Sequence, residues 1–480
     1  MPRGEEDRSL DLDPRDWDAF AGLGHRALDD MVGFLRTVRD RAVWVEAPAD
    51  VRRQFDVDLP VAGRAFADVL DDFDRLIKPY ATGNTHPAFM GWVHGAGTPV
   101  GMIAEMLAAG LNANCGGRNH IGIEVERQVT RWMQRAFRFP DTAAGVFVTG
   151  TSMANFLALL VARNHALGDD VRSRGLVGGP QLVAYASKAA HGCIAQAMQL
   201  SGLGSDHLRL IACGADGTMR PADLEAAVAA DRGRGLKPFL VVGTAGSVDI
   251  GAIDPLARIA AFCRQSDLWF HVDGAFGALL AFSPTMGPLI AGIELADSIA
   301  FDFHKWAHVP YDAGFVLVRD GAAQRRTFAS ANGYLTRSDV GLAAGEIWPC
   351  DLGPDLSRGF RALKTWFTLQ VFGTEHLGNC MAQTCELAKY LEGRLQAHPD
   401  FALSAPVALN IVCFSVTGAD ADARNRRIVE RLHLSGRAAP SITLLDGRAV
   451  IRCAIVNHRT TRATIDRFVS DLEDAARDLA

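Results

Sequence analysis

The sequence has few features of a secreted, membrane-spanning or nucleic-acid-binding protein. Its nine cysteines are scattered singly, with no CxxC pair and an odd total, which argues against a disulfide framework and a zinc site. Glycine, proline or charge interrupts each apolar run before it could span a bilayer. The acidic start "MPRGEEDRSLDLDPRDWDAF" lacks the apolar centre of a secretory signal, and no basic block accompanies the net charge of −6. These absences predict a cytoplasmic protein with reduced thiols and no metal, membrane or nucleic-acid partner.

Lysine is also scarce, with six in 480 residues, so most of the positive charge is on arginines. The rest of the composition, 49% hydrophobic and 22% charged, is that of a globular chain with a large core. One of the few lysines, Lys305, lies in the otherwise apolar stretch "SIAFDFHKWAHVPYDAGFVLV". An ammonium in such a stretch calls for a chemical explanation.

Hydrophobic periodicity divides the chain into three parts. Residues 1–83 have helical spacing and predict an N-terminal helical arm, which is too thin to bury its own apolar face. Residues 84–365 alternate short apolar strands with longer amphipathic stretches, which predicts an α/β domain with a mostly parallel seven-stranded sheet. Residues 366–480 predict a small C-terminal α+β domain. The seven predicted strands are "GVFVTG", "QLVAYAS", "LRLIAC", "PFLVVGT", "LWFHVDG", "SIAFDF" and "GFVLVRD".

Ligands of an open parallel sheet bind beyond the carboxyl ends of its strands, so the residues that follow each strand are the candidates. In "VFVTGTSMANF", Gly150, Thr151 and Ser152 lead directly into an amphipathic helix. The free N–H groups and dipole of such a helix favour an anion such as phosphate. An ordinary helix cap by Thr151 or Ser152 is the alternative.

Three further strand ends carry polar residues. Asp273 ends an apolar strand, where a buried carboxylate needs a partner such as a pyridinium N–H, although a turn or cap role is an equal alternative. His191 follows another strand and is either a packing residue or a support for a flat ring. Thr244 lies in a glycine-rich turn that needs no functional explanation by itself.

The apolar surroundings of Lys305 suggest a chemical role for this lysine. A lysine in a desolvated crevice loses part of the stabilisation of its charged form, and its neutral amine is a nucleophile toward an aldehyde. The sequence thus predicts a Schiff-base lysine. The alternative is a surface lysine that extends from an edge strand into solvent.

Together these residues resemble the fold-type I pyridoxal-phosphate enzymes, and more narrowly the group II amino-acid decarboxylases. The resemblance extends over nearly the whole chain through "NTHPAFMGW", "EVERQVTRWM", "HVDGAFGA", "DFHKW", "SRGFRALKTWF" and "LNIVCFSV". It implies that Lys305 bonds to pyridoxal 5'-phosphate, Asp273 pairs with the pyridine nitrogen and His191 stacks on the ring. The remaining cofactor residues that it implies are Gly150, Thr151, Ser152, Thr244, Ala275 and His304.

The resemblance also implies a homodimer, an acid catalyst and a substrate pocket. Tyr334, in the stretch "FASANGYLTRSDVG", matches the tyrosine to which reprotonation is attributed, and packing is its alternative role. Trp92, Val93 and His94 match the lining of the side-chain pocket, and Arg118 is a candidate for pairing with an acidic side chain. Asp302 is not counted as a ligand.

These features predict decarboxylation of an L-amino acid to its amine and CO2, with an aromatic substrate slightly favoured. Decarboxylation of an acidic or other polar amino acid, aldehyde synthesis and transamination stay open, since the same cofactor set supports them. A catalytically silent dimeric scaffold is the alternative outside enzymes.

Overall fold

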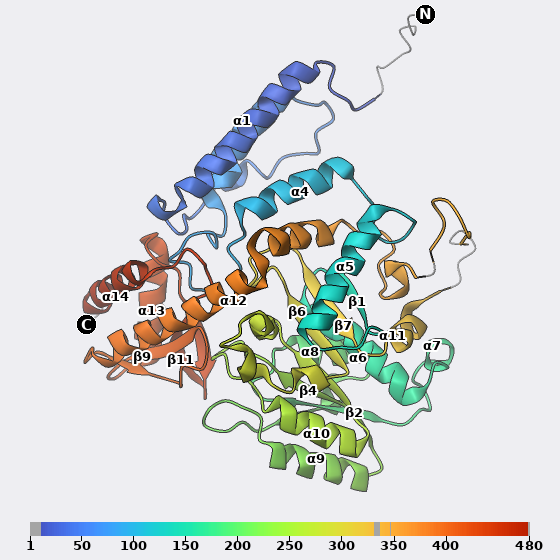
Figure 1. Cartoon of the computed structure of the whole chain (residues 1–480). Helices are drawn as coiled ribbons and strands as arrows, with labels where there is room; N and C mark the ends of the chain where they lie inside the picture. Colours follow the sequence, from blue (N-terminus) through green and yellow to red (C-terminus); the bar gives the residue numbers. More distant parts are fainter. Residues whose placement is uncertain (1–10, 331–336, 346, 479–480) are drawn as a thin grey trace, which may run out of the picture.

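A seven-stranded sheet forms the centre of the computed structural model, which describes residues 11–330, 337–345 and 347–478 (Figure 1). Its strands lie in the order β1-β7-β6-β5-β4-β2-β3, and only β7 runs antiparallel to its neighbours. All seven strands predicted from the sequence are present, so the predicted fold class is confirmed. Their bounds are β1 (Ala144–Val148), β2 (Leu182–Ser187), β3 (Leu208–Ile211), β4 (Lys237–Thr244), β5 (Trp269–Asp273), β6 (Ser298–Asp302) and β7 (Gly314–Val318).

Helices cover both faces of this sheet, as expected when parallel strands are joined by crossovers. Side chains of α6 and α8 pack on one face against Val148, Ala186 and Val242. Side chains of α5, α9, α10 and α12 pack on the other face against Phe147, Val241 and Phe270. The helices of this part are α4 (Pro99–Leu111), α5 (Ile121–Ala136), α6 (Thr151–Leu167), α7 (Val171–Arg174), α8 (Cys193–Leu200), α9 (Pro221–Gly233), α10 (Leu256–Ser266) and α11 (Gly321–Phe328).

Strand alternation decides which side chains meet α6. Along β5, Phe270 and Val272 join the core on the α10 side, whereas Trp269 belongs to the core on the α6 side. Because successive side chains of a strand point to opposite faces, His271 and Asp273 lie on the α6 side with Trp269. This places a histidine and a carboxylate between the sheet and a buried helix.

A second sheet of four antiparallel strands, in the order β10-β11-β9-β8, lies near the C-terminus (Figure 1). The sequence predicted β9 (Ile411–Val416) and β11 (Arg448–Ala454) but not β8 (Phe401–Leu403) or β10 (Ser441–Leu445). Helices α12 (Arg361–Gln396), α13 (Ala421–Leu434) and α14 (Arg462–Arg477) accompany it. Helix α12 spans the predicted domain boundary at residue 365 and is interrupted at Gly373, where φ is 70°.

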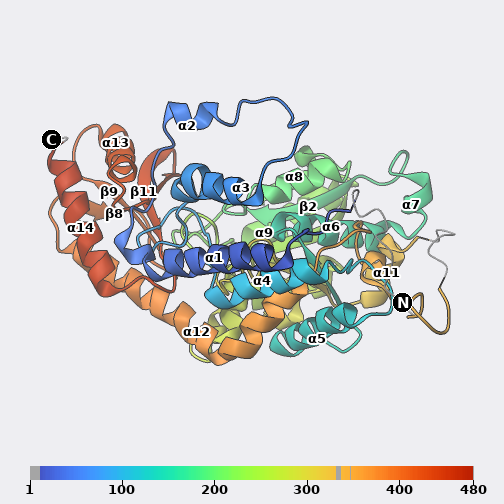
Figure 2. The same ribbon diagram turned by 90° about the horizontal axis from the view of Figure 1, so that it is seen from above.

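The N-terminal helices are α1 (Trp17–Arg36), α2 (Ala49–Arg53) and α3 (Phe66–Asp72), and they lie in the segment for which an arm was predicted. Helix α1 lies beside α3, where the rings of Phe20 and Phe66 stack with centroids 5.6 Å apart (Figure 2). No residue of α1 is buried, and Trp17 is 60% exposed. The arm therefore leaves apolar surface uncovered in the single chain.

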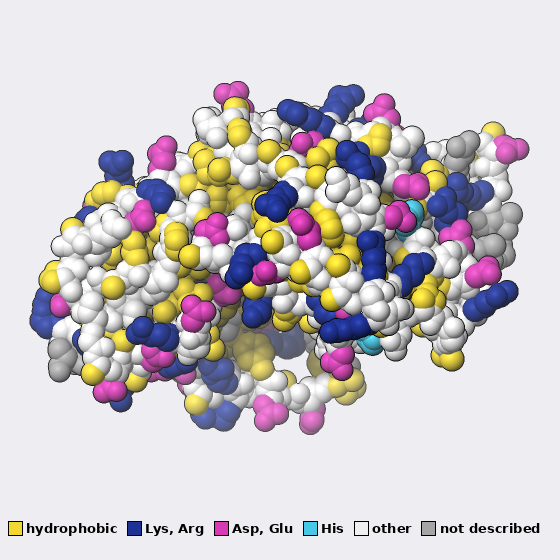
Figure 3. Space-filling view, turned by 90° about the horizontal axis from the view of Figure 1, so that it is seen from below, with side chains coloured by type: hydrophobic (Ala, Val, Ile, Leu, Met, Phe, Trp, Pro, Cys, Tyr) yellow, Lys and Arg dark blue, Asp and Glu magenta, His cyan; other side chains and the backbone are white. Residues whose placement is uncertain are grey.

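The face seen from below carries charged side chains of both signs, interspersed with apolar ones (Figure 3). It has no extended region of positive charge of the kind that tracks a nucleic-acid backbone. Within the described residues, none of the helices is both long enough and apolar enough to cross a membrane.

Candidate active site

The predicted cofactor residues surround one hollow at the carboxyl ends of the parallel strands. Its cavity volume is about 410 Å³. Adjacent strands bring distant residues together, because Thr244 on β4 pairs in register with Asp273 on β5. The lining includes Gly150, Thr151, Ser152, His191, Thr244, Asp273, Ala275, His304 and Lys305, and also Trp92, Val93 and His94.

Lys305 projects into this hollow from the turn after β6, and Asp302 holds it. The ammonium Nζ lies 2.9 Å from Oδ2 of Asp302, a carboxylate that is only 2% exposed. The same carboxylate accepts a hydrogen bond of 2.7 Å from the backbone N–H of Thr151. Asp302, which the sequence analysis set aside, therefore connects the reactive lysine to the first turn of α6.

His304 lies beside this pair as a neutral imidazole. Burial lowers the pKa of His304 to about 4, against the opposing charge of Asp302. Its Nδ1 accepts a hydrogen bond of 3.0 Å from the N–H of Ala313. The proton of the neutral ring must therefore be on Nε2, which lies 3.5 Å from Oδ2 of Asp302.

Asp273 is likewise almost fully buried, at 3% exposure. It accepts hydrogen bonds from Asn155 Nδ2 at 3.0 Å and from the N–H of Ala275 at 3.2 Å. Burial raises the pKa of Asp273, while the positive charge of Lys305 opposes that rise. A cation within contact of Asp273 would favour the ionised carboxylate further.

The polar groups around the hollow fit pyridoxal phosphate. The hydroxyl oxygens of Thr151 and Thr244 are buried and have no hydrogen-bond partner among the described residues, although both residues line the hollow. Buried hydroxyls normally have partners, so two such groups facing one cavity indicate a polar ligand. The first turn of α6 suits its phosphate, Asp273 suits a protonated ring nitrogen, and Lys305 suits an aldehyde.

Aromatic rings form the outer wall. His94 stacks on Phe89 and on Trp92, with ring centroids 5.7 Å apart in both pairs, and is T-shaped against Tyr311 at 6.0 Å. Phe89 and Trp92 are themselves 6.2 Å apart, so the three rings form one cluster. Burial, aided by the charge of Lys305, lowers the pKa of His94, so this ring is neutral near pH 7. The wall reaches the inner site because Tyr311 lies 4.2 Å from the ring of His304.

Two backbone features hold this wall against the lysine turn. A Cβ on Gly95 would lie 2.1 Å from the carbonyl oxygen of His304, so this close approach requires glycine. Trp92 has a φ of 51°, in the left-handed region that tryptophan rarely adopts. Arg452, 3% exposed, donates to the carbonyl oxygens of Trp92, Val248 and Asp249 and fixes that conformation.

One predicted site residue, Arg118, lies away from the hollow. Arg118 does not line it: the guanidinium lies over the ring of Trp348, with its carbon 4.8 Å from the ring centroid. The left-handed backbone of Arg118 (φ 85°) accompanies this position, and its assignment to the substrate pocket stays a prediction. Tyr334 lies outside the described residues.

Sequence reasoning missed Asn155, Asp302, Tyr311 and Arg452. Each is recognised by contacts with residues distant in the sequence, such as the hydrogen bond from Asn155 to Asp273. The one signal for Arg452 is its charge within the apolar strand "RAVIRCAIV". The signal for Asp302 is a carboxylate three residues before the lysine.

Comparison with known proteins gives a consistent result. Residues 48–417 match the pyridoxal-dependent decarboxylase conserved domain. The chain is 30% identical to an aromatic-L-amino-acid decarboxylase of Bacillus atrophaeus over 95% of both chains, and 27% identical to a phenylacetaldehyde synthase of Arabidopsis thaliana over 92% of this chain and 93% of that one. Its fold is similar to that of Oryza sativa TDC, solved with PLP and tryptamine, with a TM-score of 0.89, 24% identity and coverage of 98% and 100%.

Proposed function

Because this chain belongs to the pyridoxal-dependent decarboxylase family, and is thus a pyridoxal-phosphate-dependent amino-acid decarboxylase, we propose that its substrate is an aromatic L-amino acid. The aromatic wall beside Lys305 carries this proposal. Trp92, His94 and Tyr311 line the hollow and offer flat surfaces to a ring, and Phe89 packs against the first two. Arg118, the candidate partner for an acidic side chain, lies on Trp348 outside the hollow. The name of the Bacillus atrophaeus relative agrees with this choice.

Different residues of the hollow would hold different parts of the cofactor. Lys305 would bond to its aldehyde carbon, Asp273 would pair with its ring nitrogen and His191 would lie against its ring face. Gly150, Thr151 and Ser152 would hold its phosphate, with His304 beside them and Thr244 near its phenolic oxygen. When bound, pyridoxal phosphate supplies an electron sink for the negative charge left on the α-carbon as CO2 departs.

Asp302 and Asp273 have different tasks in this arrangement. Asp302 keeps the Lys305 ammonium at 2.9 Å and takes the Thr151 N–H that an arriving phosphate would also use. An ionised Asp273 in this nearly solvent-free position would favour a proton on the ring nitrogen. His191 is oriented by accepting the N–H of Cys193 on its Nδ1 at 3.2 Å, which directs Nε2 away from that helix.

The decisive experiment offers the purified protein a panel of L-amino acids and detects amines, aldehydes and CO2. The panel holds tryptophan, tyrosine, dihydroxyphenylalanine, phenylalanine, glutamate, aspartate and 2,4-diaminobutyrate, and Lys305→Ala is the inactive control. We expect amine and CO2 from at least one aromatic substrate. Amine from an acidic or aliphatic substrate alone would refute the aromatic assignment, and aldehyde with ammonia as the main products would assign the chain to aldehyde synthesis.

We further propose a cytoplasmic homodimer. All nine cysteines are free thiols, as expected in a reducing compartment. The arm exposes Trp17, Phe20, Phe66 and Val69, whose exposed fractions are between 41% and 60%. A second copy related by a two-fold axis could cover this apolar surface with its own arm.

The homodimer has a matched test. Phe20→Asp places a charge on the exposed apolar face of α1, whereas Val177→Asp places one on a residue that is 99% exposed elsewhere. We expect light scattering to give a dimer for the unmodified protein and for Val177→Asp, and a dissociating species for Phe20→Asp. A monomeric, fully active unmodified protein would refute the proposal.

A further inference from the structure

Four successive hydrogen bonds connect Asp273 to the opposite end of its own strand. They run from Trp269 Nε1 to Ser298 Oγ (2.8 Å), from Ser298 Oγ to His271 Nδ1 (2.8 Å), from His271 Nε2 to Asn155 Oδ1 (2.8 Å) and from Asn155 Nδ2 to Asp273 Oδ2 (3.0 Å). Their residues come from β5, β6 and α6. The bonds thus form one continuous path between the sheet and that helix.

The chemistry of the two ends fixes the direction of every bond. An indole N–H can only donate, so Ser298 Oγ accepts from Trp269 and its own hydrogen is free for His271. At the other end, Asn155 directs its amide N–H at the Asp273 carboxylate, so its Oδ1 needs a donor. Neutral His271 meets both requirements with a single proton on Nε2. The other tautomer would place the Nε2 lone pair 2.8 Å from Oδ1 of Asn155.

The path is closed to solvent. Ser298 is 0%, Asn155 1%, His271 2% and Trp269 7% exposed. Burial lowers the pKa of His271 to about 3, so the imidazole is neutral throughout the working range. In a low-dielectric interior, aligned hydrogen bonds polarise one another, and here every donor points toward Asp273.

We propose that Asn155, His271, Ser298 and Trp269 are positioning residues that act through Asp273, orienting its carboxylate and keeping it ionised for the ring nitrogen of the cofactor. This inference rests on the proposed role of Asp273. It adds that the four aligned hydrogen bonds stabilise the ionised form of the Asp273 carboxylate. The tautomer of His271 sets the direction in which these bonds donate.

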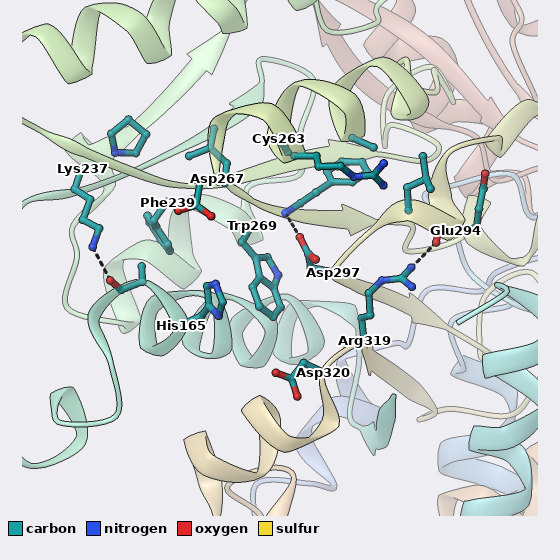
Figure 4. Close-up of a pocket in the computed structure, with 17 residues that line it drawn as sticks. His165, Lys237, Phe239, Cys263, Asp267, Trp269, Glu294, Asp297, Arg319 and Asp320 are labelled. Carbon is teal, nitrogen blue, oxygen red and sulfur yellow. Dashed lines mark hydrogen bonds between the residues drawn. The ribbon is translucent and has the colours of Figure 1, made fainter. Parts of the chain in front are cut away.

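The Trp269 end of the path lies at a second hollow, which is at the amino ends of β4 and β5. This hollow has a cavity volume of about 560 Å³, and Figure 4 shows the Trp269 indole in its wall beside His165 and Asp297. The His165 and Trp269 rings are 5.3 Å apart. Trp269 is thus the member farthest along the path from Asp273, and its influence should be the weakest.

Two amide substitutions at residue 271 separate this role from packing. The terminal nitrogen of His271→Gln is as many bonds from the backbone as Nε2, so it can still donate to Asn155. His271→Asn can accept from Ser298 but is too short to reach Asn155. A packing role predicts similar behaviour for the two amides, whereas the proposed path predicts that only the glutamine rescues.

The measurement is the ¹⁵N chemical shift of the ring nitrogen in holoenzyme loaded with ¹⁵N-labelled pyridoxal phosphate, followed from pH 6 to 9 beside kcat. We expect a protonated ring nitrogen in the unmodified protein. At the alkaline end, the ratio of protonated to unprotonated ring nitrogen should fall about tenfold in His271→Asn, which loses the hydrogen bond to Asn155. In His271→Gln, which keeps that bond, the ratio should fall less than about twofold.

Smaller changes keep the inference testable if His271→Asn folds poorly. Ser298→Ala should lower the ratio less than His271→Asn, and Trp269→Phe should lower it least, although it removes the most atoms. The reverse order, or equal behaviour of the two amides, would overturn the inference and leave the role of Asp273 intact. An unprotonated ring nitrogen in the unmodified protein would overturn both.

Discussion

Moderate acid should destabilise this protein, because several histidines are buried as neutral rings. Burial lowers the pKa of His271 to about 3 and the pKa values of His304 and His458 to about 4. The ordinary value is 6.5, so below that pH the unfolded chain takes up protons that the folded chain refuses. The stabilisation is therefore complete above about pH 6.5 and is lost as the pH falls toward 4.

The magnitude follows from these values. At pH 5 each of the three histidines removes about 2 kcal/mol from the free energy of unfolding, at about 1.4 kcal/mol per pH unit below 6.5. Asp254 acts in the opposite sense, because burial raises its pKa to about 6 and the folded state protonates first. Its contribution at pH 5 is about 1.4 kcal/mol, so these four groups together lower the free energy of unfolding by about 5 kcal/mol.

The assay is urea unfolding of the holoprotein near pH 7.5 and pH 5, followed by circular dichroism. We expect a much lower urea midpoint at pH 5. His458→Gln should reduce the pH-dependent difference by about 2 kcal/mol, whereas the exposed His165→Gln should not change it. Equal midpoints at the two pH values, or equal effects of these two substitutions, would refute the reasoning.

Three further substitutions test the site. Arg452→Met removes the donors to the carbonyl oxygens of Trp92, Val248 and Asp249. KM should therefore rise at least about tenfold while cofactor binding changes little, which steady-state kinetics and a cofactor titration would measure. Asp273→Asn should lower kcat at least about a hundredfold with a small change in cofactor affinity, since only the charge on the ring nitrogen's partner is lost; an unchanged kcat would contradict its role. Tyr334→Phe, predicted from sequence alone, should preserve CO2 release but divert product from amine to aldehyde with oxygen uptake, and unchanged amine yield would leave Tyr334 a packing residue.

Much of the fold could be predicted because each central strand is a short apolar run bounded by turn residues. The edge strands β8 and β10 were missed, since Phe401–Leu403 has three residues and Ser441–Leu445 is only partly buried. The strand ends also identified Thr151, Thr244, Asp273 and Lys305, which the sheet brings to one hollow. This part of the prediction needed only the rule that parallel strands share a carboxyl edge.

The partners of these residues could not be predicted, because they depend on contacts across the fold. Asn155 reaches Asp273 across 118 residues, and Arg452 reaches Trp92 across 360. Arg118 was assigned to the pocket by position in the sequence, but its side chain lies on Trp348. Periodicity indicates which face a side chain occupies, and it does not indicate which distant group meets it there.

The bond between Lys305 and the cofactor is the premise of the proposed chemistry. Its test is borohydride reduction of the holoprotein followed by proteolysis and mass spectrometry of all six lysines. We expect the cofactor absorbance to be lost and the phosphopyridoxyl mass increment to be on Lys305 alone. An increment on another lysine, or none on a protein that still decarboxylates its substrate, would contradict this premise.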